Sequence, residues 1–211
     1  MFKTVILDFD GTIGDTKSLI VATMQQTIKR LGLPARTSEQ CASMIGLPLR
    51  QTFTNLIPMT DEMGDLCDRI YTELFYENNQ PGVVPLFPHV RNTIREMYVM
   101  GVTICVASSR KRDSLMAFLK EMKLSHLVSV VVSADDVTNA KPATDMVDTI
   151  MRHVDCSPEE VLVVGDTKYD IQMGKAAGTK TCAVTYGNGT RSDFSEADYI
   201  INDFSKLLDI V

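Results

Sequence analysis

The sequence predicts an α/β fold in which a parallel sheet carries helices on both faces, with a small all-helical unit inserted after the first strand. Short apolar, β-branched runs recur along the chain, and amphipathic helical patterns separate the later runs. The first run is instead followed by a long interval of helical patterns without a strand. Runs that are apolar throughout are typical of strands covered on both faces, which favours parallel pairing.

Six apolar runs are expected to form the strands. They are residues 4–7, 102–107, 128–132, 161–164, 181–185 and 199–201. Apolar residues spaced three or four apart predict helices between the later runs, from Val90 to Met97, Leu115 to Met122 and Met146 to Val154. Residues 157–160 (SPEE) have the N-cap, N1 and N3 residue types of a helix start, which favours a helix beginning there.

Residues 15–82 interrupt this alternation of strands and helices. Their helical patterns extend too far for one crossover helix, so we expect three or four helices above the end of the first strand. We therefore predict an α/β core domain of residues 1–14 and 82–211 and a helical cap domain of residues 15–81.

Composition restricts the class of protein. The 211 residues are 45% hydrophobic and 23% charged, which is enough for one sizeable core and a small accessory unit. A net charge of -6 without a long basic run argues against nucleic-acid or anionic-membrane partners. The five cysteines include no CxxC pair, so we expect reduced thiols. The short N-terminal apolar run and the absence of long apolar stretches predict a cytoplasmic protein.

Chemically active side chains follow the predicted strands, at the sheet edge where open parallel sheets bind ligands. They are Asp8, Asp10, Ser108, Ser109, Arg110, Asp135, Asp136, Lys141, Asp166 and Asp170. Two carboxylates about 4 Å apart at an effective dielectric of about 20 repel by roughly 4 kcal/mol, so such a cluster needs a cation. Oxygen ligands suit Mg²⁺, which at sparse sites is usually shared with a phosphate, and Lys141 would offset further negative charge. The sequence therefore predicts phosphate chemistry.

Four segments carry a family resemblance. In chain order they are residues 8–12 (DFDGT), Ser108, Lys141-Pro142 and residues 165–170 (GDTKYD). They resemble the four motifs of the haloacid dehalogenase superfamily of aspartate-nucleophile phosphatases. The helical insertion is similar to the small cap of its phosphoglycolate phosphatase and beta-phosphoglucomutase branch. This resemblance covers essentially the whole chain and implies a Rossmann-like core.

The resemblance implies a role for each motif residue. Asp8 would be the nucleophile that forms an aspartyl-phosphate, Asp10 the acid and base, and Lys141 the cation that neutralises charge on both nucleophile and phosphoryl group. Mg²⁺ would be held by Asp8, Asp166 and the backbone carbonyl of Asp10, with Asp170 supporting it from outside or through water.

The expected phosphate-binding and substrate-binding residues lie in the core and the cap. They are Gly11, Thr12, Ser108, Ser109 and Arg50. Arg50 ends a stretch, residues 46–50, that resembles the cap loop of relatives; an exposed arginine without a substrate role is an equal alternative. Arg110 stands where relatives often carry lysine, and Gly14 where an apolar residue is common.

These features predict a Mg²⁺-dependent phosphatase acting on a small phosphorylated metabolite, with phosphoglycolate as the first candidate. The alternatives are a pyrophosphatase or a phosphomutase similar to beta-phosphoglucomutase. A receiver-like signalling module is a further class, although the acid pair at residues 8 and 10, the second acidic motif and the helical insertion argue against it. Neither nucleic acid nor membrane is expected as a partner, and the chain is expected to be a monomer or homodimer.

Overall fold

A six-stranded parallel sheet organises the chain, of which a computed structural model describes residues 2–211. Its strands are β1 (Thr4–Leu7), β2 (Thr103–Ala107), β3 (Val130–Val132), β4 (Val161–Gly165), β5 (Lys180–Val184) and β6 (Tyr199–Ile201). Their order is β3-β2-β1-β4-β5-β6, so the chain moves outward from β1 in one direction and then crosses to β4 on its other side. The crevice beyond β1 and β4 is the topological switch point, where such sheets bind ligands.

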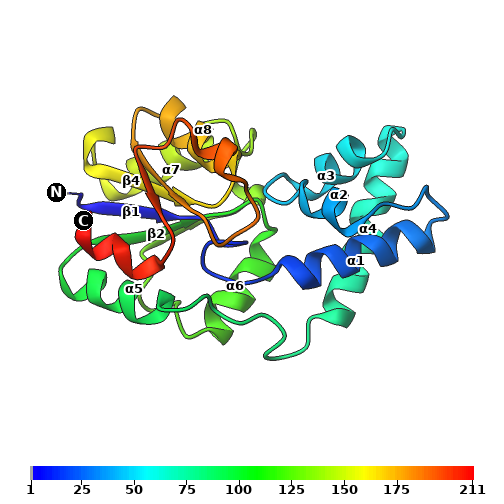
Figure 1. The fold of residues 1–211 in the computed structure, drawn as a ribbon, viewed down its shortest axis with the longest axis horizontal. Coiled ribbons are helices and arrows are strands. Elements are labelled where there is room, and N and C mark those ends of the chain that lie inside the picture. Colours follow the sequence, from blue (N-terminus) through cyan, green and yellow to red (C-terminus); the bar gives the residue numbers. More distant parts are fainter. Residues whose placement is uncertain (1) are drawn as a thin grey trace.

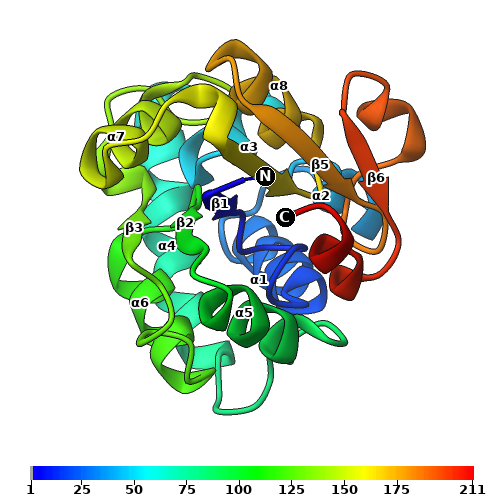
Figure 2. The ribbon, with the colours of Figure 1, turned by 90° about the vertical axis from the view of Figure 1, so that its left-hand side faces the viewer.

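Helices cover both faces of this sheet, as Figure 2 shows. α5 (Val90–Val99) and α6 (Arg112–Glu121) lie on one side, and α7 (Asp145–Val154) and α8 (Lys168–Ala176) on the other. In β1, Val5 and Leu7 join the core under α5 and α6, whereas Ile6 joins the core under α7 and α8. This explains the unbroken apolar runs of the sequence, because alternate residues of each strand are buried on opposite faces.

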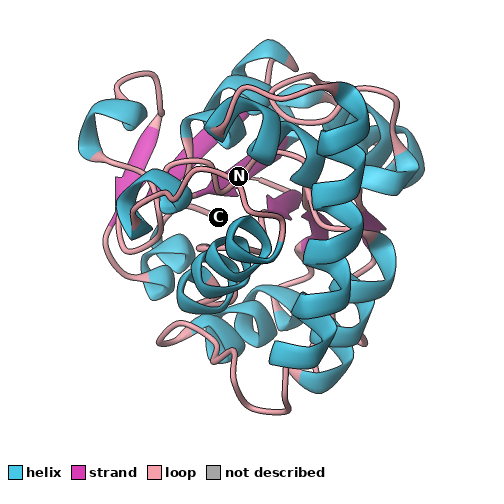
Figure 3. Cartoon of the chain, turned by 90° about the vertical axis from the view of Figure 1, so that its right-hand side faces the viewer, coloured by secondary structure: helices cyan, strands magenta, loops and turns pink. Residues whose placement is uncertain are grey.

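Four helices between β1 and α5 form a separate group, which we call the cap helices. They are α1 (Lys17–Arg30), α2 (Ser38–Ala42), α3 (Leu49–Leu56) and α4 (Asp61–Asn78). They extend from the end of the sheet opposite to the two chain ends (Figure 1), and the view onto this end shows helices joined by loops (Figure 3). Apolar side chains such as Met24, Phe53 and Cys67 are fully buried among them. The division into domains at residues 14/15 and 81/82 stays a prediction.

Four short 3-10 helices complete the elements. They are η1 (Ala134–Asp136), η2 (Pro158–Glu160), η3 (Arg191–Phe194) and η4 (Phe204–Asp209). Ser157 and Glu160 do form the capping box that the sequence indicates, but η2 ends after three residues and leads directly into β4. The predicted helix start is therefore present, and it gives only one 3-10 turn because the buried apolar run at Val161 follows at once.

All five cysteines are free thiols, and four of them are buried. Over residues 2–211, no helix has both the length and the apolarity needed to cross a bilayer.

Candidate active site

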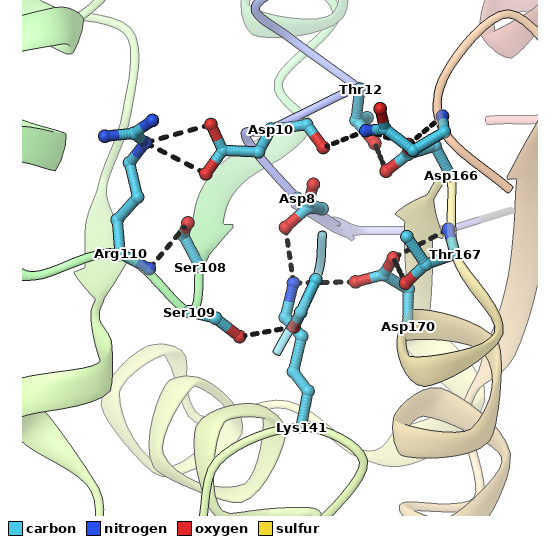
Figure 4. A network of polar contacts seen from close by, with 12 residues as sticks. Asp8, Asp10, Thr12, Ser108, Ser109, Arg110, Lys141, Asp166, Thr167 and Asp170 are labelled. Carbon is cyan, nitrogen blue, oxygen red and sulfur yellow. Dashed lines mark hydrogen bonds and ion pairs between the residues drawn. The ribbon is translucent and has the colours of Figure 1, made fainter. Parts of the chain in front are cut away.

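The loop after β1 directs two carboxylates to the switch point of the sheet (Figure 4). The backbone N–H of Asp8 donates to the carbonyl of Val164 at 2.9 Å, which extends the pairing of β1 with β4 up to the site. Gly11 turns the chain with φ 95°, and a Cβ atom there would lie 2.0 Å from an oxygen of Asp166. Only glycine fits this turn, which brings Asp8 and Asp10 next to the end of β4.

Lys141 lies between two of the carboxylates and is almost completely buried. Its Nζ donates to Oδ1 of Asp8 at 2.5 Å and to Oδ1 of Asp170 at 2.6 Å. Burial by itself would lower the pKa of Lys141, but the charges of Asp170 and Asp8 and their hydrogen bonds outweigh it and hold that pKa above its ordinary value. Lys141 is therefore a permanently charged ammonium group beside Asp8.

Asp8, Asp166 and Asp170 form a buried cluster in which one oxygen of each lies within 4.8 Å of the others. Burial raises the pKa of Asp8 to about 7, although the charge of Lys141 acts against this. Burial, followed by the charges of Asp8 and Asp170, also raises the pKa of Asp166 well above its usual range. With all three carboxylates ionised, the cluster would carry more negative charge than one lysine offsets, and its donors are all oxygen. Both features fit Mg²⁺.

The hydroxyl groups expected to bind phosphate have different surroundings. Ser108 is fully buried, and its Oγ accepts from the backbone N–H of Arg110 at 3.3 Å. Ser109 donates to the carbonyl of Gly46, which precedes α3, at 2.8 Å. Thr12 donates to Asp166 at 3.4 Å. Thr12 therefore contacts the carboxylate cluster and Ser109 connects the core to the cap. The phosphate-binding roles of Ser108, Ser109 and Thr12 stay predictions.

A cavity of about 240 Å³ lies between the ends of the strands and the cap helices. Asp8, Asp10 and Arg110 line it on the core side. Apolar cap residues that line it are Ile20, Met24, Ile45, Leu47, Leu49, Tyr71, Phe75 and Tyr76. Further polar residues, among them Arg50 and Lys111, also line it. Concave sites that combine apolar walls with polar groups are typical of binding sites for small molecules.

Arg50 lines the cavity from α3, but cap carboxylates already pair with it. Its guanidinium contacts Asp61 at 2.9 Å and Asp65 at 2.7 Å, and its side chain is 45% exposed. The predicted contact between Arg50 and substrate stays a prediction, and any such contact would compete with these two ion pairs.

Asn188 is a site residue that the sequence analysis missed. Its backbone N–H and its Nδ2 donate to the same oxygen of Asp166 at 2.6 and 2.9 Å, and Nδ2 also lies 3.3 Å from the carbonyl oxygen of Asp10. Asn188 therefore holds the Asp8–Gly11 loop against the loop after β4. It follows β5 with glycine on either side, so an inspection of the end of the fifth strand would have found it.

Arg110 follows a predicted strand and departs from the family pattern, but no role was assigned to it from the sequence; in the structure it contacts Asp10 directly. Its Nε lies 2.9 Å from both carboxylate oxygens of Asp10. The centre of its guanidinium lies 4.7 Å from the ring centre of Phe75 in α4 and 4.8 Å from that of Phe118 in α6. Because one ring belongs to the cap and the other to the core, Arg110 joins these two parts of the molecule beside the site.

The next residue along the chain makes a further connection to the cap. The Nζ of Lys111 forms an ion pair with Asp68 of α4. Ser109, Arg110 and Lys111 thus each contact the cap, and they directly follow Ser108 at the end of β2.

Comparison with known proteins assigns the family. A sequence model described as haloacid dehalogenase-like hydrolase matches residues 5–184. The chain belongs to this family. Its fold, expected from the sequence motifs, is confirmed by a haloacid dehalogenase-like hydrolase structure from Bacteroides fragilis, which is 25% identical with a TM-score of 0.93 over 98% of this chain and 100% of that one.

Other relatives of this haloacid dehalogenase-like hydrolase have more specific names. A pyrophosphatase PpaX from Oceanobacillus iheyensis is 32% identical over 99% of this chain and 96% of its own length. A predicted phosphoglycolate phosphatase from Haemophilus somnus is 22% identical with a TM-score of 0.88, and it covers 99% of this chain and 97% of its own. The second comparison concerns the fold alone.

The buried ion pairs of Lys141 lead to a prediction about the stability of this hydrolase. Replacing Lys141 with methionine would leave the carboxylates of Asp8 and Asp170 facing each other without their cation. Removal of one partner from a buried pair costs about 3–5 kcal/mol, so we expect the free energy of unfolding in urea without divalent metal to fall by about that amount. The matched control is Lys120→Met on the exposed side of α6. An unfolding free energy equal to that of the control would contradict the prediction.

Proposed function

We propose that this hydrolase is a Mg²⁺-dependent phosphatase of a small phosphorylated metabolite that acts through an aspartyl-phosphate on Asp8. The observation that supports this most strongly is the Lys141 Nζ at 2.5 Å from Asp8, inside the buried cluster with Asp166 and Asp170. A carboxylate that attacks phosphorus needs a fixed orientation and nearby positive charge to approach an anionic phosphoryl group.

The proposed reaction proceeds in two displacements. An oxygen of Asp8 attacks phosphorus, the bond from phosphorus to the leaving oxygen breaks, and Asp10 gives its proton to that oxygen. Water then attacks the phosphorus of the aspartyl-phosphate while Asp10 takes a proton from it, which releases inorganic phosphate and regenerates Asp8. Lys141 would hold Asp8 in place through both steps, and the buried hydroxyl of Ser108 would donate to a phosphoryl oxygen.

The carboxylates of Asp8 and Asp166 and the carbonyl of Asp10 would hold Mg²⁺, and Asn188 would keep the last two oriented. The bound ion would supply charge neutralisation for the phosphoryl oxygens. Asp170 would act indirectly, because Lys141 and the N–H and hydroxyl of Thr167 already occupy its oxygens.

Two substrates are candidates. Phosphoglycolate follows from the resemblance of the motifs and cap. Pyrophosphate is the second candidate, because relatives that are named pyrophosphatases are 30% and 32% identical over 99% of this chain. Either molecule is small enough for a cavity of about 240 Å³. A monomeric or homodimeric state and a location in the cytoplasm stay predictions.

A substrate panel tests the proposal. Release of inorganic phosphate would be measured from phosphoglycolate, pyrophosphate, sugar phosphates and nucleotides, with Mg²⁺ and with a chelator. We expect rapid release from one or both candidates with Mg²⁺, a fall to the buffer blank on chelation, and recovery when Mg²⁺ is restored. The proposed function would be overturned if no compound released phosphate with Mg²⁺ present, or if phosphate release were undiminished in the chelator.

A further inference from the structure

Arg110 differs from the other two cations that line the cavity, Arg50 and Lys111. The side chains of Arg50 and Lys111 are each 45% exposed and pair with carboxylates of the cap helices. The side chain of Arg110 is only 9% exposed and lies beside the proposed acid and base. It is therefore the cavity cation whose charge solvent screens least.

The guanidinium of Arg110 also retains a free donor. Nε contacts Asp10, and Nη1 donates to Oγ of Ser114 at 2.8 Å, but Nη2 makes no hydrogen bond within residues 2–211. The rings of Phe75 and Phe118 hold the guanidinium plane in place. A fixed planar cation with an unused N–H group is well suited to bind a carboxylate or phosphate group.

The contact with Asp10 cannot persist in the proposed reaction. Asp10 has to face the leaving oxygen, whereas in the structure both of its carboxylate oxygens lie 2.9 Å from Nε of Arg110. When Asp10 turns toward the substrate, Arg110 is left as a buried cation without its anion, which is costly. A second anion supplied by the substrate would remove this cost.

We propose that Arg110 binds a second anionic group of the substrate, which replaces Asp10 as its partner. This inference rests on the proposed function and defines its substrate class. The substrate would be a phosphomonoester or phosphoanhydride with a carboxylate or a second phosphoryl group close to the phosphorus that is attacked. An ester of the same size without a second anionic group leaves Arg110 paired with Asp10, and this pairing keeps Asp10 away from the leaving oxygen.

Two matched pairs of substrates test this inference without any mutation. The first pair is 2-phosphoglycolate and 2-hydroxyethyl phosphate, which replaces the carboxylate with a neutral CH₂OH group. The second is pyrophosphate and methyl phosphate. In at least one pair, we expect the member with the second anionic group to have the higher kcat/KM by about 10- to 100-fold, as for one or two charge-assisted hydrogen bonds.

Variants then assign this preference to Arg110. Arg110→Gln should reduce kcat/KM for the preferred substrate by about 10- to 100-fold and leave kcat/KM for the partner without the second anion within about threefold, so that the preference disappears. Arg110→Lys, which keeps the charge but not the planar fork, should recover part of it. The matched control is Arg112→Gln, since Arg112 is 46% exposed, pairs with Asp136 and does not line the cavity. This control should retain the full preference.

The possible outcomes separate this inference from the proposed function. Hydrolysis of both members of each pair at similar kcat/KM by the unmodified protein would overturn the inference while the phosphatase function stands. An equal loss of kcat/KM in Arg110→Gln for substrates with and without the second anionic group would also overturn it, because Arg110 would then only position Asp10. If the unmodified protein hydrolyses none of the four compounds and none of the wider panel, the proposed function fails and the inference with it.

Discussion

Replacing Asp8 with asparagine is expected to abolish Mg²⁺-dependent phosphate release, with a loss on the order of 10⁶-fold, as when an enzyme loses its covalent nucleophile. An amide oxygen is a poor nucleophile toward phosphorus, and the substitution keeps the shape of the side chain. Lys141 would retain Asp170 at 2.6 Å, so the buried site would keep one ion pair and the fold should persist.

The measurement is phosphate release at saturating Mg²⁺, together with mass spectrometry of the intact protein after brief mixing with substrate. The unmodified protein should show a fraction that carries one phosphoryl group, and Asp8→Asn should show none. Asp15→Asn, an exposed aspartate just beyond the same loop, is the matched control and should resemble the unmodified protein. Substantial activity in a folded Asp8→Asn protein would remove Asp8 from the nucleophilic role.

Replacing Asp10 with asparagine is expected to lower kcat by about 10²- to 10⁴-fold, the usual contribution of a positioned general acid and base. The size of this loss should depend on the substrate. An ester with a basic alkoxide leaving group needs the proton from Asp10, whereas p-nitrophenolate leaves without one, so its first displacement should be less affected.

Rapid mixing of Asp10→Asn with p-nitrophenyl phosphate provides the corresponding measurement. We expect a burst of p-nitrophenolate equal to the enzyme concentration, followed by slow turnover. The aspartyl-phosphate on Asp8 would accumulate because its hydrolysis needs Asp10 to activate water. Equal rate losses for the alkyl and p-nitrophenyl esters without a burst would exclude Asp10 as the acid and base.

The sheet and the convergence of its motifs were predictable because both depend on local patterns and a general rule of topology. Residues 4–7 and 161–164 are apolar on both faces, so they are predicted as buried strands of one parallel sheet, and the residues after such strands lie at the same edge; the structure adds that the two strands are neighbours. Asp8 and Asp166, which are 158 positions apart in the sequence, come together for this reason alone.

The rule of topology points to Arg110 and Asn188 as residues that follow strands, but it does not predict their contacts. The partners of Arg110 include Phe75, whose position depends on how the cap helices sit over the sheet, and no local pattern encodes that arrangement. Asn188 belongs to a glycine-flanked loop whose path is set by its approach to Asp166. Similarly, the capping residues at Ser157 indicated how a helix begins but not that η2 would end after three residues.

The contacts of Ser109, Arg110 and Lys111 with the cap connect the position of the cap helices to the position of Ser108. Ser109 contacts Gly46, Arg110 contacts Phe75, and Lys111 contacts Asp68. A movement of the cap helices away from the sheet would therefore break these contacts or displace three successive residues. The next residue toward β2 is Ser108. In the proposed reaction, an opening of the cap helices would therefore also displace Ser108, so the phosphoryl group would be bound least tightly when the cavity is most open to solvent.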